Sequence, residues 1–190
     1  IYQVPAADAV IDPHQEDCNY PYKELCGAGV AYKLVRVLLE ELEIDPAKAE
    51  YLIENVAIAT IGDVVNLTGE NRIFVRTGLE MLKKTKNEGL KALFECTGID
   101  VENLNTYHIG FVIGPCINAC GRLDTAKRAL ELLNAPGRRE AVMMAEDLKA
   151  LNESRKEMTE KGVERAVEMI ETSVLKKDSV LVVYLPDCHE

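Results

Sequence analysis

The sequence predicts a mainly α-helical chain in which a long helix leads to a buried β-strand. Apolar residues recur at helical spacing through most of residues 27–172. Residues 137–172 contain no proline and many charges, so they predict one helix of about 50 Å at ~1.5 Å per residue. The run SVLVVYLPD, residues 179–187, predicts a buried strand that begins a further unit.

The N-terminal part predicts a short strand and a polar loop. Residues 8–12, DAVID, lie between Pro5 and Pro13, and a proline disfavours helix at the residue before it. The loop PHQEDCNYPYKE, residues 13–24, carries two prolines and two tyrosines. It fits either an ordered extended segment or a plain connection.

Two amphipathic helices are predicted next. The first starts at Gly27 and should bury one face. The second, within residues 45–65, has Asp45 as N-cap and Pro46 at the first helical position. Its apolar run at 56–61 predicts a deeply buried end. The face expected to be buried in the first helix comprises Val30, Leu34, Val37, Leu38 and Leu42.

Further helices are expected before and through the long one. Their predicted ranges are 70–84, 89–98 closed by Gly98, 105–114 ending near Pro115, 123–133 and 137–172. A highly charged helix with an apolar stripe typically bridges two domains. A coiled coil is the alternative, but the stripe holds no clean heptad. The stripe comprises Val142, Ala145, Leu148, Leu151, Met158, Val163, Val167 and Ile170.

The net charge of −10 argues against a freestanding nucleic-acid binder, because an acidic surface repels phosphate. A local nucleic-acid site stays compatible, since a nuclease uses carboxylates to hold divalent ions. No uninterrupted apolar run of about 18 residues and no leader are present, so we expect no membrane span, no signal peptide and a cytoplasmic protein. The 6 cysteines are irregularly spaced and are expected to be reduced.

Asp63 is the most informative acidic residue. Its neighbours Ile61, Gly62, Val64 and Val65 are apolar or small. We expect the carboxylate to be desolvated there, so it needs either a hydrogen-bonding partner or a metal ion. Metal ligation and helix capping both remain open.

The stretch IGPCINACGRLDTA, residues 113–126, admits three interpretations: a metal site of its cysteines, a surface that contacts phosphate, or a plain corner between two helices. Cys116 and Cys120 could bind zinc only with two further ligands, His108 being the nearest, so two small apolar fillers are favoured. Asn118 and Arg122 are four apart and project from one side of a helix. They could meet a phosphate, or Arg122 could cap or salt-bridge a neighbouring helix.

Several common enzyme motifs do not occur. The sequence has no glycine-rich phosphate loop with its lysine, no G-x-S-x-G and no H-E-x-x-H.

Three separated segments carry a resemblance to a known family. They are AVIDPHQEDCNYPYKELCGAGVAYKL, AIATIGDVVNLTGENRIFVRTGLEML and IGPCINACGRLDTAKRALELL. Together with LNESRKEMTE and VYLPDCHE, they resemble the RecJ single-stranded-DNA-specific exonucleases of the DHH phosphoesterase superfamily.

The resemblance implies an α/β fold for the whole protein, with this segment mainly helical. Residues 1–135 would be the C-terminal part of the DHH catalytic domain, 136–173 the connecting helix, and 174–190 the start of the DHH-associated domain. The active site would lie between the two domains. It would use two Mn²⁺ or Mg²⁺ ions, most of whose ligands lie outside this fragment.

The resemblance also assigns site residues. Asp63 matches a metal-binding aspartate and would be catalytic. Asn118 and Arg122 match the family's INAxGR-like segment, with both facing the substrate phosphate and Arg122 stabilising its charge, and His189 starts a histidine–glycine motif expected to bind substrate. Cys116 departs from the pattern, since relatives often carry arginine there.

The implied activity is 5′ to 3′ digestion of single-stranded DNA in repair and recombination. The implied partners are single-stranded DNA, single-strand-binding protein and a helicase. The Asp-x-Asp and Asp-His-His motifs do not occur and would lie before Ile1, so the fragment alone is expected to be inactive. The alternatives are a phosphoesterase for oligonucleotides or cyclic dinucleotides and a non-catalytic replication scaffold.

Overall fold

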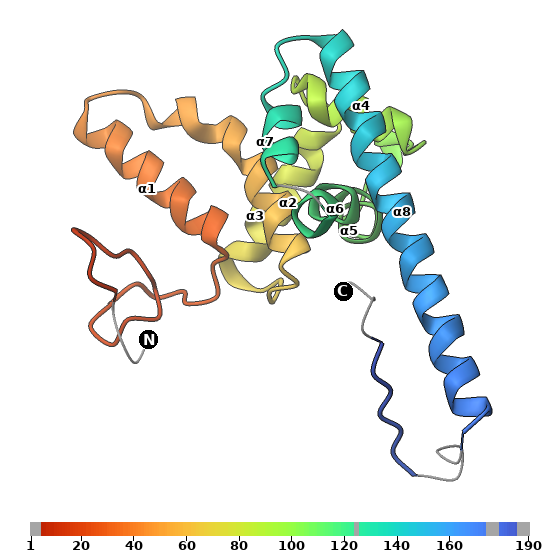
Figure 1. Cartoon of the computed structure of the whole chain (residues 1–190). Coiled ribbons are helices and arrows are strands. Elements are labelled where there is room, and N and C mark those ends of the chain that lie inside the picture. The colour runs from red at the N-terminus through yellow and green to blue at the C-terminus, as the bar shows by residue number, and fades with distance from the viewer. Residues whose placement is uncertain (1–4, 124–125, 174–178, 186–190) are drawn as a thin grey trace. The chain divides into compact units, whose positions relative to one another are not determined.

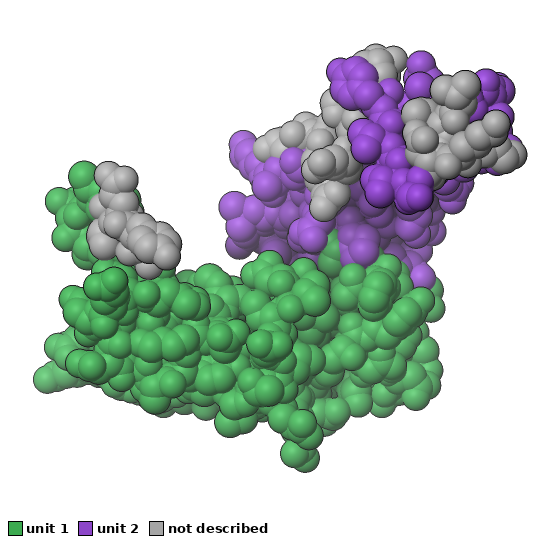
Figure 2. Space-filling model, turned by 90° about the horizontal axis from the view of Figure 1, so that it is seen from below, with its two compact units in different colours: residues 1–86, 98–114 green, residues 87–97, 115–190 purple. Residues whose placement is uncertain are grey.

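The computed structural model describes residues 5–123, 126–173 and 179–185 (Figure 1). Residues 5–26 are irregular, and helices joined by short connections follow from Gly27 to Glu171. The predicted mainly helical class is therefore confirmed. The chain divides into two compact units (Figure 2). The first comprises 1–86 and 98–114, and the second comprises 87–97 and 115–190.

The first unit contains the helix that ends just before Asp63. Asp45 caps the 3₁₀ helix η1 (Pro46–Leu52) by accepting from the N–H of Ala47 at 2.9 Å, as predicted. The helix expected over 45–65 is divided into a 3₁₀ part and an α part. The elements are α1 (Gly27–Glu41), η1 (Pro46–Leu52), α2 (Ile53–Gly62), α3 (Gly69–Leu82), η2 (Val101–Asn103), α5 (Thr106–His108) and η3 (Ile109–Ile113).

An aromatic pair lies in the core of the first unit. The rings of Tyr32 on α1 and Phe74 on α3 meet edge to face, with centroids 5.5 Å apart, an arrangement that stabilises beyond area burial alone. Helices α2 and α3 approach so closely that a Cβ on Gly78 would lie 2.3 Å from the Cβ of Ala57. The other buried members of this core are Leu25, Ala49 and Val56.

Helix α1 starts at Gly27 as predicted, but its buried side is different. Gly29 and Tyr32 are its buried residues. The face predicted to be buried is open, with Val37 at 52% exposure and Leu42 at 66%. Val30 is partly buried against the core, but no described helix covers the rest of this face, because α1 turns its Tyr32 side toward α2 and α3. The expectation of a buried leucine–valine face was wrong for the described residues.

The second unit contains α4 (Glu88–Cys96), α6 (Gly114–Leu123), α7 (Lys127–Leu133) and the 34-residue α8 (Arg138–Glu171). The predicted long helix is thus confirmed to within a residue at each end. The first half of α8 packs on α4 and α7, whereas Val163 and Val167 farther along are exposed. The core of this unit includes Leu90, Leu93, Phe94, Leu132, Ala141, Ala145 and Leu148.

The predicted helix end near Pro115 was wrong. Helical residues run without interruption from Thr106 to Leu123, through the π-helical turn η3. Pro115 is the second residue of α6 and directly follows the π-helical turn η3, where the regular hydrogen-bond pattern of the helix is interrupted. The sequence motif at 113–126 therefore starts inside a continuous helix.

Neither predicted strand forms within the described residues. Residues 8–12 are irregular, and residues 181–185 form no ladder. Val180 and Val182 are about four-fifths exposed, at 78% and 80%, so this segment is not buried either. A strand needs a neighbouring strand to receive its backbone hydrogen bonds, and the described part of the chain supplies none.

Across the described ranges, every helix is too short or too polar to span a bilayer.

Candidate functional site

Asp63 lies at the C-cap of α2, where its N–H donates to the carbonyl oxygen of Ala59 at 2.8 Å. The residue is exposed, so the expectation that its carboxylate is desolvated was wrong. The buried residues of α2 are Val56, Ala57 and Thr60, whereas the chain leaves the helix at Asp63. Within the described residues the carboxylate has no hydrogen bond or ion pair, and an exposed, unengaged carboxylate is free to act as a ligand.

The residue after Asp63 has a strained backbone. Val64 has φ +55° and is 88% exposed. Positive φ is an outlier for a β-branched residue, and such strain persists only where surrounding structure maintains it. The loop of residues 63–68 therefore depends on contacts made farther along.

Asn71 provides the first of these contacts. Its side chain is fully buried, and its Nδ2 donates to the carbonyl oxygens of Glu24 at 2.7 Å and Asn66 at 3.0 Å. One amide thereby joins the loop to the segment before α1. Its Oδ1 is buried and has no hydrogen-bond partner among the residues that the structure describes, which leaves one acceptor unsatisfied there. We call the contacts of Asn71 and Tyr22 with residues 66–69 the loop latch.

Tyr22 provides the second part of the loop latch. Its hydroxyl donates to the carbonyl oxygen of Thr68 at 2.8 Å and lies 3.3 Å from the Thr68 hydroxyl. Gly69 has φ +45°, and a Cβ there would lie 2.7 Å from the ring of Tyr22. Both the backbone conformation and the contact with Tyr22 therefore require glycine at position 69.

A charged triad lies beside the loop latch. Glu70 accepts from the hydroxyl of Tyr20 at 2.7 Å and from Nζ of Lys33 at 2.6 Å. Burial opposes the charge of both ionisable groups, but the hydrogen bonds and the ion pair outweigh it, so the pKa of Glu70 is lowered and the pKa of Lys33 is raised. Lys33 also lies over the rings of Tyr20 and Phe74. The triad ties the N-terminal loop, α1 and α3 together.

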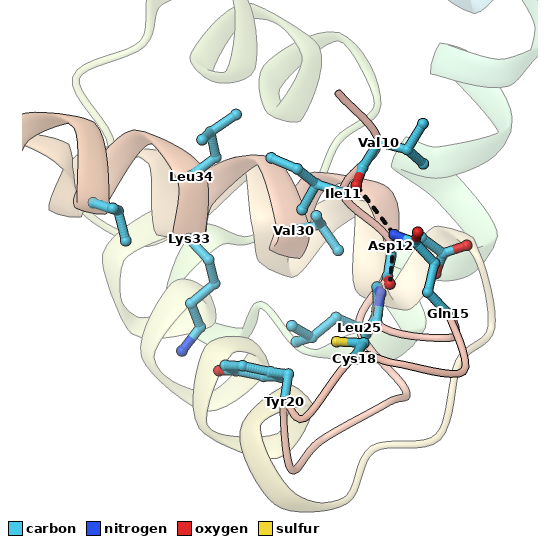
Figure 3. A pocket seen from close by; sticks show the side chains of 12 residues that line it. Val10, Ile11, Asp12, Gln15, Cys18, Tyr20, Leu25, Val30, Lys33 and Leu34 are labelled. Carbon is cyan, nitrogen blue, oxygen red and sulfur yellow. Dashed lines mark hydrogen bonds between the residues drawn. The ribbon is translucent and has the colours of Figure 1, made fainter. Parts of the chain in front are cut away.

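A cavity of about 450 Å³ opens between α1 and residues 10–20 (Figure 3). Gln15 orders its rim by donating to the carbonyl oxygens of Val10 at 3.1 Å and Asp12 at 3.5 Å. The walls are mainly apolar, and the ammonium group of Lys33 is already paired with Glu70. The loop of residues 13–24 thus makes specific hydrogen bonds, but it forms turns at residues 13–17 and is not extended throughout, as the first interpretation expected.

The second unit carries the other predicted site residues on α6. Asn118 is exposed there, as contact with a phosphate requires. Arg122 belongs to the same helix, one turn on, and its side chain lies outside the described residues, as does all of His189. Asp63 belongs to the first unit, so a joint site for metal and phosphate stays a prediction.

The two cysteines of α6 are fillers of the interior. Cys116 is 2% exposed, and Cys120, fully buried, donates from Sγ to the carbonyl oxygen of Ile117 at 2.8 Å. Burial raises the pKa of Cys116. His108, considered as a zinc ligand, instead accepts from the N–H of Asn105 in a capping box. Nowhere in the described ranges do three His, Cys, Asp or Glu side chains gather at a metal-binding distance.

Two buried asparagines, Asn71 and Asn152, are not among the residues predicted from the sequence. Asn71 lies in phase with the buried face of α3, at the positions that Phe74, Val75 and Gly78 continue. A polar residue at an inward position of an amphipathic helix is a signal, because burying an amide is unfavourable unless it has partners. The same signal marks Asn152 on the buried side of α8.

The comparisons with known proteins agree with this architecture. No family model matches. The RecJ exonuclease of Bacillus subtilis is 38% identical over 180 residues, which is 95% of this chain and 22% of that protein. The RecJ exonuclease of Escherichia coli is 35% identical over 201 residues, covering 98% of this chain and 35% of that protein.

Solved structures show the same relationship. RecJ from Thermus thermophilus in complex with Mg²⁺ matches with a TM-score of 0.71 at 32% identity, covering 79% of this chain and 23% of that one. An exonuclease RecJ bound to manganese matches with a TM-score of 0.71 and 32% identity, over 80% and 38% of the two chains. This chain spans about a fifth to a third of its curated relatives. Similarity of sequence and structure over most of its length shows that the chain is a segment of a RecJ-family protein.

Proposed function

We propose that this chain is part of the catalytic core of a metal-dependent, single-stranded-DNA-specific 5′ to 3′ exonuclease. The observation that supports the proposal most is the 35–38% identity to RecJ exonucleases over 95–98% of the chain. The biological setting we propose is DNA repair and recombination. The five free cysteines among the described residues fit the reducing cytoplasm, where we place the protein.

Asp63 is the residue that we propose as a metal ligand and catalytic carboxylate. RecJ structures hold Mg²⁺ or Mn²⁺, and an exposed aspartate on a latched loop suits either ion. When bound, such ions clamp a phosphodiester and activate a water. Asp63 fits as one ligand, but the described residues bring no further set together. Most ligands of the two ions must come from elsewhere in the full-length protein.

Asn118 and Arg122 are proposed to bind the DNA phosphate. They lie one turn apart on α6, and Asn118 is exposed. A guanidinium presents forked donors to a phosphate and stabilises the charge that develops on it. His189 is proposed as a further substrate-binding residue. Contact with DNA phosphate through these few side chains is compatible with a net charge of −10, because the positive charge of the contacting side chains acts locally.

The domain ranges 1–135, 136–173 and 174–190 remain our proposal for the full-length protein. In that protein, α8 would connect the DHH domain to the DHH-associated domain. Single-strand-binding protein and a helicase are the protein partners that we propose.

Digestion of DNA by the full-length protein tests this function. The substrate is a long single strand labelled at its 5′ or its 3′ end, with Mn²⁺ or Mg²⁺ and with EDTA. We expect metal-dependent release of the 5′ label first and no digestion of duplex. Preferential cleavage of dinucleotides or cyclic dinucleotides would replace the proposal with the other phosphoesterase class, and no cleavage of any substrate would favour a scaffold.

The isolated 190-residue chain gives a second test. One carboxylate cannot hold two catalytic ions, so we expect this chain alone to leave single-stranded DNA intact. Metal-dependent digestion by the purified chain would contradict the assignment of the remaining ligands to other parts of the protein.

A further inference from the structure

We propose that Arg155, on α8, is an additional phosphate-binding residue for single-stranded DNA and that the buried Asn152 positions it. The proposal rests on the proposed exonuclease function and names a residue outside the motif of Asn118 and Arg122. The observations that carry it are contacts within the second unit.

Asn152 is unusual because it is polar and almost completely buried. It is 4% exposed and lies where α8 meets α6, with its Nδ2 donating to Sγ of Cys116 at 3.7 Å. A thiol sulfur is a weak acceptor, so this contact compensates poorly for desolvating an amide. A leucine would pack there without that penalty. Stability alone therefore does not explain an asparagine at position 152.

The other end of the Asn152 amide orients Arg155. Oδ1 accepts from Nε of Arg155 at 3.3 Å and from Nη2 at 3.1 Å. A guanidinium has five N–H donors, and two are used here, which leaves the others for a ligand. Because Asn152 already holds the guanidinium group of Arg155 in one orientation, less conformational entropy is lost when that group binds an anion.

Arg155 has no carboxylate partner among the residues that the structure describes. Its neighbours at helical spacing are Leu151, Asn152, Met158 and Thr159, none of them acidic. The half-buried guanidinium is therefore charged, oriented and unpaired. This combination favours an external anion.

The surroundings of Cys116 add a second positive charge. Lys156, next to Arg155, acts electrostatically on the Cys116 thiol and opposes the effect of burial on its pKa. Glu153 acts in the opposite direction, but it is paired with Lys149 at 3.9 Å. Arg155 and Lys156 thus lie near α6, the helix that carries Asn118 and Arg122. A DNA strand has a phosphate at every nucleotide, so it can contact both α6 and α8.

The experiment measures binding of the full-length protein to fluorescein-labelled oligothymidylate in EDTA, over a series of salt concentrations. We expect Arg155→Ala to weaken binding roughly tenfold. We also expect the slope of log K against log salt to fall by about 0.7, the value for one phosphate contact on a single strand. Arg155→Lys should restore the slope and only part of the affinity. Lys161→Ala removes the same charge from an exposed position of α8 and should change neither.

Asn152→Leu separates positioning from structural support. We expect it to leave the thermal midpoint unchanged or raised while weakening DNA binding several-fold. Unchanged affinity and slope in Arg155→Ala would overturn the phosphate contact. Unchanged binding in Asn152→Leu would overturn the positioning role. If the wild-type protein neither binds nor digests single-stranded DNA, the proposed function itself fails. If Asp63→Asn loses digestion but Arg155→Ala binds DNA normally, the proposed function stands and only the role of Arg155 is refuted.

Discussion

The side-chain amide of Asn71 donates to the carbonyl oxygen of Asn66 at 3.0 Å and so holds the loop that begins at Asp63. The same nitrogen donates to the carbonyl oxygen of Glu24 at 2.7 Å. These bonds join two segments that are far apart in the sequence. They explain how Val64 is held at positive φ beside the proposed metal ligand.

Replacing Asn71 with leucine should destabilise the chain. The substitution removes the two hydrogen bonds that Asn71 donates to the carbonyl oxygens of Glu24 and Asn66 and places an apolar side chain against them, which costs about 2–4 kcal/mol of unfolding free energy. Urea unfolding followed by circular dichroism measures this. Asn134→Ala is the matched control, because the exposed Asn134 also donates to a carbonyl, that of Leu130, and should cost less than about 1 kcal/mol. Equal costs for the two variants would contradict the loop latch.

Gly69→Ala tests the contact between the loop and Tyr22. Gly69 and Gly98 both have positive φ, but only at Gly69 would a Cβ meet another residue, the ring of Tyr22 at 2.7 Å. Gly98→Ala therefore measures the conformational cost alone, about 1 kcal/mol. We expect Gly69→Ala to cost at least about 1 kcal/mol more, because the ring must move. The midpoint of thermal unfolding measures the effect of each variant. Equal shifts in Gly69→Ala and Gly98→Ala would show that Tyr22 does not pack against Gly69.

The charged triad predicts a defined pH dependence of stability. The pKa of Glu70 lies below its ordinary value of 4.5, so its contribution is present above that pH and is lost as the pH falls through the lowered value. The pKa of Lys33 lies above its ordinary value of 10.5, so its contribution is present below that pH and is lost as the pH rises through the raised value.

Glu70→Gln should therefore lower the unfolding free energy by about 1–2 kcal/mol at neutral pH. The difference from wild type should shrink as the pH falls below 4.5. Glu164→Gln, at an exposed position of α8, should show almost no difference at either pH. Urea titrations at several pH values measure this, and a difference that persists unchanged in acid would exclude the Glu70 charge as its source.

The elements with strong local signals could be predicted from the sequence. The long helix α8, the Asp45 cap and the start at Gly27 follow from proline placement, capping residues and apolar spacing. The end predicted at Pro115 failed because that proline falls in the first turn of α6, after a π-helical turn that no local pattern marks.

Features that depend on distant segments could not be predicted. Periodicity identified the apolar face of α1 but not what covers it, and the described elements pack on its Tyr32 side instead. The apolar neighbours of Asp63 suggested burial, yet the helix ends there and exposes the carboxylate. Strands also depend on partners, which explains why residues 8–12 and 181–185 form none.

Asp63→Asn in the full-length protein tests the account most directly. Asparagine keeps the shape and the exposed position but removes the charge that a divalent ion requires. We expect Mn²⁺-dependent digestion of single-stranded DNA from the 5′ end to fall at least about a hundredfold, with an unchanged unfolding midpoint. Digestion at the wild-type rate by Asp63→Asn would contradict the assignment of Asp63 as a catalytic metal ligand.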